Sequence, residues 1–214
     1  MARKTKEEAL VTRCAILDTA ERVFRERGVA ATSLAAIATA AGVTRGAIYW
    51  HFRNKNDLLM ALFERVSLPM EQMLAAAAID TEDPFARLRE LSIQVLRLVT
   101  RDERTRCVFE TMLTRCERTD EIAALTQRQM HCRADAVQVI QGIFRDAVRR
   151  GSLPPGVNPR RAAIGLVAYV DGLIYDWLTD PAGFDLAREA PPLVDQFLDG
   201  LRCPAEAVAG GRAA

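Results

Sequence analysis

The sequence predicts an all-α protein of about nine helices. Apolar residues recur every three or four positions over most of the chain, which is the spacing of one buried face on a helix. The segments with this spacing are separated by Gly, Pro, Asn and Asp, which begin and end helices. No stretch alternates apolar and polar residues as a half-buried strand does. With 214 residues, half of them hydrophobic, the chain can bury one large core or two smaller ones.

The first helix is predicted from about Glu7 to Arg27, behind a basic arm of residues 1–6. Gly28 ends it, because glycine tolerates the left-handed backbone of a helix C-terminus. The apolar positions of this helix form one face: Leu10, Cys14, Leu17, Ala20, Val23 and Phe24.

Residues 32–54 are predicted to form two short helices joined by a tight turn. The first, at about 34–41, follows the capping pair Thr32-Ser33 and ends at Gly42. Thr44 can cap the second, which begins at Arg45. The apolar residues of the pair can bury one shared face: Leu34, Ile37, Ala38, Ala41, Val43 and Ile48. This pattern is typical of a helix-turn-helix motif, whose second helix enters the major groove of DNA.

The same signals predict the remaining helices. Asn54 caps a connector helix that starts at residue 55 and continues past Pro69 with a kink. Further helices are expected at about 84–100, 103–116, 119–150 with a capping box at Thr119, 159–179 after Asn158, and 191–202 from the pair Pro191-Pro192. The tail after Pro204 is expected to be disordered.

Charge is distributed unevenly along the chain. The net charge is +1, but residues 1–60 hold ten Lys and Arg against six Asp and Glu, which leaves the remainder at −3. A basic end on a slightly acidic body suits nucleic-acid binding by that end. We find no signal peptide and no apolar run near the roughly 18 residues of a membrane span, so a cytoplasmic protein is expected. The five cysteines form no CxxC pair, so reduced thiols are expected rather than disulfides or zinc.

Residues 16–59, ILDTAERVFRERGVAATSLAAIATAAGVTRGAIYWHFRNKNDLL, resemble the N-terminal domain of TetR-family transcriptional repressors. The start MARKTKEE and the body stretches AVRRGSLP and AYVDGLI are similar to the AcrR/TtgR branch, whose members repress genes for RND-type multidrug efflux pumps. The resemblance implies a homodimer, a double-stranded DNA operator near the controlled gene, and release by a ligand. It implies a helix-turn-helix DNA-binding domain at 1–54, a ligand-binding and dimerisation domain at 55–204 and a tail at 205–214.

The candidate DNA-reading residues begin at the second short helix. Arg45 can make a bidentate contact to guanine O6 and N7, worth about 1–3 kcal/mol of discrimination. The resemblance implies phosphate contacts by Tyr49, His51 and Lys55, and helix N-termini favour anions. The full predicted set is Thr32, Ser33, Thr44, Arg45, Gly46, Ala47, Tyr49, Trp50, His51 and Lys55. An alternative places Trp50 and Phe52 in the core and gives His51 a capping or packing role.

Twelve residues of the body are predicted to line a ligand pocket. They are Leu88, Leu91, Phe109, Met112, Leu113, Val137, Ile140, Phe144, Val167, Val170, Asp171 and Ile174. The alternative is that each apolar one is simply core. Asp171 is the polar candidate, because a buried carboxylate needs a partner such as a ligand, an arginine or a hydroxyl.

The resemblance implies that the aspartate matching Asp171 faces the ligand in drug-sensing relatives. Phe109 and Leu113 stand where one such relative has Asn and His, so the pocket here is expected to be more apolar. Lipophilic or aromatic compounds are the expected ligands.

The last two predicted helices carry the remaining large apolar surfaces, and two copies are expected to join them into a four-helix bundle. The candidate interface residues are Ala163, Val167, Tyr169, Leu173, Val194, Phe197, Leu198 and Leu201. A two-fold dimer predicts a roughly palindromic operator.

Other functions remain open. They are regulation of another pathway, such as fatty-acid or aromatic metabolism, DNA binding without a ligand, and redox sensing through Cys107, Cys116 and Cys132. No cofactor or metal is predicted. An enzyme is not expected, because the sequence lacks paired carboxylates, a nucleophile motif, a phosphate loop and a set of metal ligands.

Overall fold

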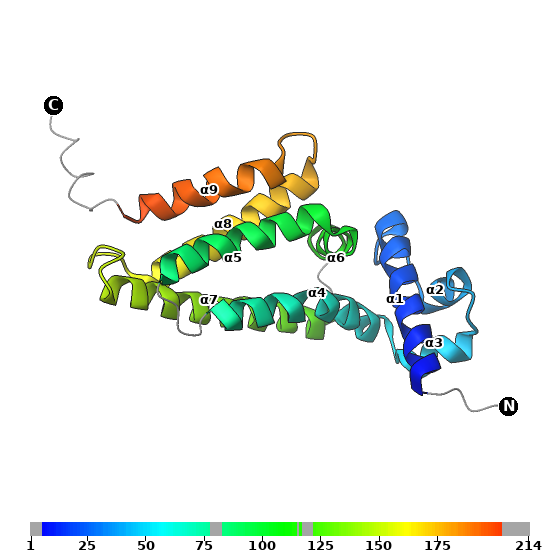
Figure 1. The fold of residues 1–214 in the computed structure, drawn as a ribbon. Helices are drawn as coiled ribbons and strands as arrows, with labels where there is room; N and C mark the ends of the chain where they lie inside the picture. Colours follow the sequence, from blue (N-terminus) through cyan, green and yellow to red (C-terminus); the bar gives the residue numbers. More distant parts are fainter. Residues whose placement is uncertain (1–5, 78–82, 115, 117–121, 203–214) are drawn as a thin grey trace. The chain divides into compact units, whose positions relative to one another are not determined.

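The computed structural model describes residues 6–77, 83–114, 116 and 122–202. These residues form nine helices and no strand (Figure 1), which confirms the all-α prediction. The helices are α1 Lys6–Arg27, α2 Leu34–Ala40, α3 Arg45–His51, α4 Lys55–Ala77, α5 Pro84–Arg101, α6 Glu103–Thr114, α7 Ala123–Arg149, α8 Pro159–Thr179 and α9 Leu186–Gly200. Residues 1–5 of the predicted arm, the capping box at Thr119 and the predicted tail lie outside the described residues.

The helices divide into two compact units. The first comprises Met1–Ser67 and Glu103–Gln129, and the second Leu68–Asp102 and Met130–Ala214. Within the first, α1 packs against α2 and α6, and α2 packs against α3. Within the second, α5 packs against α8 and α9. The predicted domain boundary after Asn54 stays a prediction, because a compact unit need not coincide with a functional domain.

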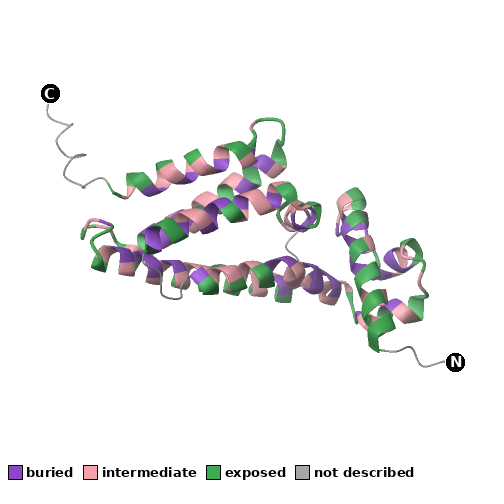
Figure 2. Ribbon diagram, viewed as in Figure 1, coloured by how far each residue is buried: buried purple, intermediate pink, exposed green. Residues whose placement is uncertain are grey.

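Around the helix-turn-helix, the core of the first unit is built by α1, α2, α3 and the start of α4 (Figure 2). Its fully or almost fully buried side chains include Ile16, Leu17, Val23, Phe24, Ile37, Ile48, Phe52, Leu58 and Leu59. Leu10 and Cys14, predicted on the same face of α1, are exposed. None of residues 6–15 is buried, and the side-chain hydrogen bonds from α6 to α1 among the described residues lie at Asp18, Glu21 and Arg25. Helical spacing therefore predicted the buried face of α1 but not how far along α1 other helices pack against that face.

The helix caps of the helix-turn-helix are those that the sequence predicts. The hydroxyl oxygen of Ser33 accepts the Ala36 N–H at 3.2 Å, and that of Thr44 accepts the Ala47 N–H at 3.1 Å. Gly42 has a φ of +67°, which a residue with a Cβ adopts only under strain. These local interactions set the angle at which α3 leaves the turn.

The start of α9 differs from the prediction. The helix begins at Leu186, five residues before the Pro191-Pro192 pair that was expected to open it. The Asp185 carboxylate caps the earlier start by accepting the Arg188 N–H at 3.1 Å. Leu186 and Ala190 are fully buried. The two prolines each remove one backbone donor, but the cap and the buried first turn outweigh that loss.

Candidate DNA-binding site

Arg45 opens α3 on the exposed face of the first unit. The capping Thr44 holds the first turn, and Gly46 beside Arg45 is also exposed. The Arg45 guanidinium carbon lies 5.7 Å from the centroid of the Tyr49 ring, one helical turn further on. This cation–π contact restricts the rotamers of an otherwise free side chain. The helix therefore presents one guanidinium at its N-terminal end with small neighbours around it, which suits bidentate contact to a base edge.

The three aromatic residues after Tyr49 have different roles. Trp50 is 73% exposed, so the alternative that placed it in the core is wrong. Its ring meets the His51 ring edge to face, with centroids 4.6 Å apart. Phe52 is 2% exposed and lies under Arg13, which confirms its core assignment. α3 therefore carries Tyr49 and Trp50 as large exposed aromatic side chains.

A polar hollow of about 410 Å³ lies where the start of α2 meets the end of α3 and the start of α4. It is lined by Ala30, Ala31, Thr32, Ser33, Leu34, Tyr49, Arg53, Asn54 and Lys55. The structure therefore brings together four of the predicted phosphate-contacting residues from three separate stretches of sequence. Ser33, Tyr49 and Lys55 each place a side chain that carries a donor on the lining of this hollow, and anion binding needs several donors in one place.

The predicted members of this hollow are not equally available. Thr32 is buried, and its hydroxyl donates to the Gly28 carbonyl at 2.7 Å, so its side chain points inward. The Lys55 ammonium donates one hydrogen bond to the Val29 carbonyl at 3.1 Å. This hydrogen bond anchors the Lys55 side chain at the edge of the hollow. Ser33 uses its oxygen as the acceptor of the helix cap and keeps its O–H.

Arg53 lines the same hollow and was not among the predicted residues. Its side chain is 87% exposed, and its Nε donates to Asp57 Oδ2 at 2.9 Å while its Nη2 donates to Oδ1 at 3.3 Å. The guanidinium holds the pKa of the Asp57 carboxyl below its usual value, so this carboxylate stays ionised. The sequence carried a signal for this pair, because Arg53 and Asp57 are four residues apart.

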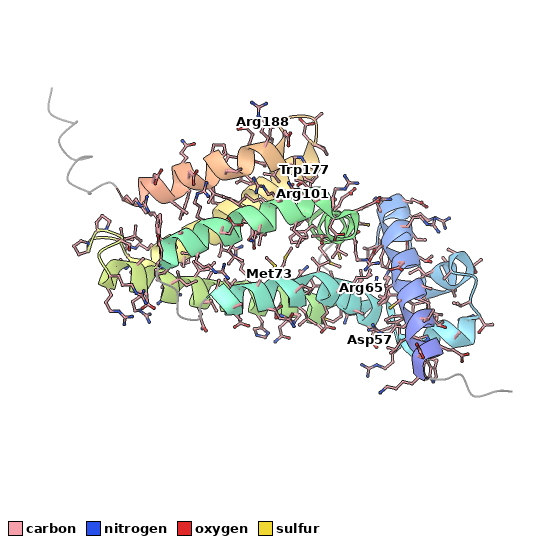
Figure 3. All side chains as sticks on the ribbon, in the orientation of Figure 1. Asp57, Arg65, Met73, Arg101, Trp177 and Arg188 are labelled. Atoms are coloured by element: carbon pink, nitrogen blue, oxygen red, sulfur yellow. The ribbon has the colours of Figure 1, made fainter. Side chains whose placement is uncertain are left out.

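A partly buried ion-pair cluster joins α1 to α4 and α6 through Arg65, which is labelled in Figure 3. Arg65 of α4 donates to Asp18 at 2.7 Å and to Glu21 at 3.0 Å, and Arg104 of α6 donates to Asp18 at 3.0 Å. Glu21 is only 8% exposed, and burial raises the pKa of its carboxyl although two arginines lie beside it. The cluster therefore links three helices of the first unit through partly buried charges, each of which is compensated by an opposite charge.

The thiols of Cys107 and Cys116 are not activated. Cys107 is buried, its thiol donates to the Glu21 carbonyl, and burial raises its pKa to about 11. Burial also raises the pKa of Cys116. A redox sensor needs a thiolate at neutral pH, so these two sites favour the alternative of inert thiols.

The twelve predicted pocket residues are divided between the two units. Phe109, Met112 and Leu113 belong to the first unit and the other nine to the second. In the second unit Leu88, Leu91, Ile140, Phe144 and Ile174 are buried, whereas Val137, Val167 and Val170 are half-buried. None of the twelve lines the hollow beside α3 or the second surface hollow, which lies around Trp177 and Arg101. The ligand pocket therefore stays a prediction.

Asp171 is not the buried carboxylate that the sequence suggested. Its side chain is 54% exposed on α8 and forms an ion pair with Arg133 of α7. An arginine was one of the partners considered for it. The apolar segment around Asp171 misled the prediction, because α8 has an exposed apolar face as well as a buried one.

Two family models cover most of the chain. Residues 16–62 match the bacterial regulatory proteins of the tetR family, and residues 83–203 match the C-terminal region of MAATS-type transcriptional repressors. The chain belongs to the TetR family of transcriptional regulators. This membership confirms the resemblance seen in residues 16–59, and it agrees with the helix-turn-helix geometry of α2 and α3.

Several TetR-family relatives match along almost their full length. The HTH-type transcriptional regulator TtgR of Pseudomonas putida is 43% identical, over 94% of this chain and 97% of the relative. AcrR of Shigella flexneri is 41% identical, over 95% and 96%. Among solved structures, NalD, the secondary repressor of the MexAB-OprM multidrug efflux pump in Pseudomonas aeruginosa, is 37% identical, with a TM-score of 0.85 over 92% of this chain and 98% of NalD. SmeT, in its complex with triclosan, is 37% identical, with a TM-score of 0.82 over 91% of this chain and 93% of SmeT.

Proposed function

We propose that this TetR-family protein is a cytoplasmic homodimeric repressor of a multidrug efflux operon of the RND type, released from its operator by lipophilic or aromatic compounds. The observation that carries the proposal is the exposed surface of α3, with Arg45 at its start and the donor-lined hollow at its end. The relatives support the regulated genes, since NalD and SmeT are repressors of multidrug efflux pumps. Ligand release is supported by the triclosan complex of SmeT.

A gel-shift experiment with the DNA upstream of the protein's own gene tests this function. We expect a discrete complex that a scrambled duplex of equal length does not compete away. Addition of triclosan, as one lipophilic aromatic probe, should release the DNA if it binds the DNA-free arrangement more tightly than the DNA-bound one. Specific binding that no lipophilic compound reverses would leave a repressor without the proposed ligand response.

The dimer is proposed to form through α8, although by a different face from the one predicted. Ala163, Val194 and Leu198 are fully or almost fully buried within the single chain and are therefore core. The Tyr169 ring stacks on Phe197 and its hydroxyl donates to the Leu193 carbonyl, so these residues join α8 to α9 internally.

Three apolar residues instead form a stripe on the exposed side of α8: Ile164, Ala168 and Tyr175, at positions i, i+4 and i+11. The exposed carboxylate of Asp171, which is paired with Arg133, lies within this stripe at i+7. By length and composition α8 is also apolar enough to cross a membrane, but that is weak support for a span. The apolar stripe supports contact with a second copy.

Ala168→Arg should break this contact, because it places a charged side chain at the centre of the stripe. We expect the substituted protein to elute as a monomer in size-exclusion chromatography with light scattering, and to bind the operator at least about tenfold more weakly, because the two half-sites are no longer read together. Ala86→Arg on the exposed side of α5 is the matched control and should leave the dimer intact. A dimeric Ala168→Arg protein would place the interface elsewhere.

A further inference from the structure

We propose that Arg53 is a phosphate-binding residue of the DNA interface and that Asp57 is the positioning residue that aims it. The proposal rests on the proposed function of the first unit as a DNA-binding head. Neither residue belongs to the set predicted from the sequence. The assignment follows from how the guanidinium is held and from where its free edge lies.

The Arg53 guanidinium uses only one of its edges within the chain. Nε and Nη2 together grip the two oxygens of Asp57 at 2.9 and 3.3 Å. Nη1 and the second proton of Nη2 have no partner among the described residues. A guanidinium has five N–H donors in a rigid plane, so the remaining edge can bind two oxygens of one phosphate. Lysine, with a single charge centre on a flexible stem, could not be shared in this way.

Asp57 is itself fixed and cannot follow a moving side chain. Its Oδ2 also accepts the backbone N–H of Arg53 at 3.2 Å, and its own N–H donates to Asn54 Oδ1 at 2.8 Å. The carboxylate lies in the first turn of α4, where the helix dipole stabilises a negative charge. The turn 53–57 therefore holds the guanidinium plane in one orientation before any DNA is bound.

The side chain also stands in the right place. Arg53 lines the hollow that contains Ser33, Tyr49 and Lys55. An isolated exposed pair of arginine and aspartate contributes little to stability, so stability alone gives no reason for this arrangement. A guanidinium held beside three other donors adds one directed contact to the same anion-binding surface.

Asp57→Asn has effects of opposite sign on DNA affinity under two competing explanations. If Asp57 were only a negative charge near DNA, Asp57→Asn would tighten binding by reducing repulsion. If Asp57 aims Arg53, Asp57→Asn frees the guanidinium and weakens binding despite the more favourable net charge. A gain and a loss of affinity are easily told apart.

The experiment measures Kd by fluorescence anisotropy over a series of salt concentrations, on the operator and on an unrelated duplex. Arg53→Gln should weaken binding to both duplexes about tenfold and reduce the slope of log K against log salt by about 1.8 for a dimer, as one phosphate contact per subunit is lost. Asp57→Asn should weaken binding about threefold in the wild-type background. In the Arg53→Gln background Asp57→Asn should no longer weaken binding, because the guanidinium that Asp57 positions is absent.

Arg22→Gln and Glu26→Gln are the matched controls. They alter the other exposed arginine–carboxylate pair at the same spacing in this unit, 3.3 Å apart on α1, and should leave Kd within twofold of wild type. An unchanged salt slope in Arg53→Gln would overturn the phosphate assignment, and tighter binding by Asp57→Asn would overturn the positioning role. If the wild-type protein bound the operator and the unrelated duplex with equal affinity, the proposed function would instead be overturned. The Arg53 contact would still be measured on the unrelated duplex.

Discussion

Arg45→Ala should weaken operator binding by at least about 30-fold while leaving binding to an unrelated duplex within about threefold. A bidentate arginine–guanine contact contributes about 1–3 kcal/mol of discrimination, and a two-fold dimer makes it twice. Arg45 carries this role because it opens α3, has the small Gly46 beside it, and is restrained by the Tyr49 ring at 5.7 Å. The measurement is anisotropy titration of both duplexes at one fixed salt concentration, since affinity for DNA depends steeply on salt.

Two outcomes would contradict this role for Arg45. An equal loss on both duplexes would make Arg45 a phosphate contact, and no loss on either would remove it from the interface. Arg22→Ala, on the exposed side of α1, is the control for the change of one positive charge. The contrast with Arg53 sharpens the test, because Arg53→Gln is expected to weaken both duplexes alike, whereas Arg45→Ala should change the preference between them.

Arg65→Met should destabilise the first unit by about 3–5 kcal/mol. The substitution leaves the nearly buried carboxylate of Glu21 without its main partner, and an uncompensated buried charge has a cost of this size. Urea unfolding followed by circular dichroism gives the change in the free energy of unfolding. Arg104→Met, which removes a half-exposed arginine 3.7 Å from the same carboxylate, should cost less than about 1 kcal/mol.

The double substitution Arg65→Met with Glu21→Gln decides the cause of that loss. If the unpaired charge is responsible, removing it should recover most of the lost stability. The dependence of stability on pH should also identify the Glu21 charge as the cause. Burial raises the pKa of Glu21 in the folded protein above its ordinary value of 4.5, so the folded state holds this proton more tightly than the unfolded state does. The Glu21 contribution therefore falls as pH rises from 4.5 through the folded pKa.

Arg65→Met should accordingly lose less stability at about pH 5 than at about pH 7. Glu21→Gln should abolish that difference. A loss that does not depend on pH, and is not recovered by Glu21→Gln, would mean that Arg65 stabilises the unit through the packing of its stem.

The helices and their caps were predictable because their causes are local. Ser33, Thr44 and Gly42 act on backbone groups within four residues of themselves, so the sequence alone contains both partners of each interaction. Proline was less reliable than these caps as an indicator of where a helix starts. Pro191-Pro192 looked like a helix start, but the real start depends on Asp185 and on the burial of Leu186 by the rest of the second unit.

The sequence indicated candidate DNA-reading residues, whose roles stay predictions, but it did not indicate how they are arranged in space. The position at the start of α3 indicated Arg45, and the resemblance to TetR-family repressors implied Tyr49 and His51. Only the folded chain shows that Thr32 turns inward and that Arg53 shares a hollow with Lys55. Thr32 turns inward through a local hydrogen bond to the Gly28 carbonyl. The hollow depends on how the stretch before α2 meets the turn before α4, two segments that are not adjacent along the chain.

The sequence by itself determined the helical class, the helix-turn-helix and the TetR family, because periodicity, caps and motif residues are written along the chain. The tertiary structure decided which side of each apolar helix is covered. α8 is apolar on nearly every side, so spacing could not tell that Ala163 belongs to the core, that Ile164 is exposed, or that Asp171 pairs with Arg133. The physical reason is that the burial of a residue depends on which other elements pack against it, and the elements that pack against α8 come from distant parts of the chain.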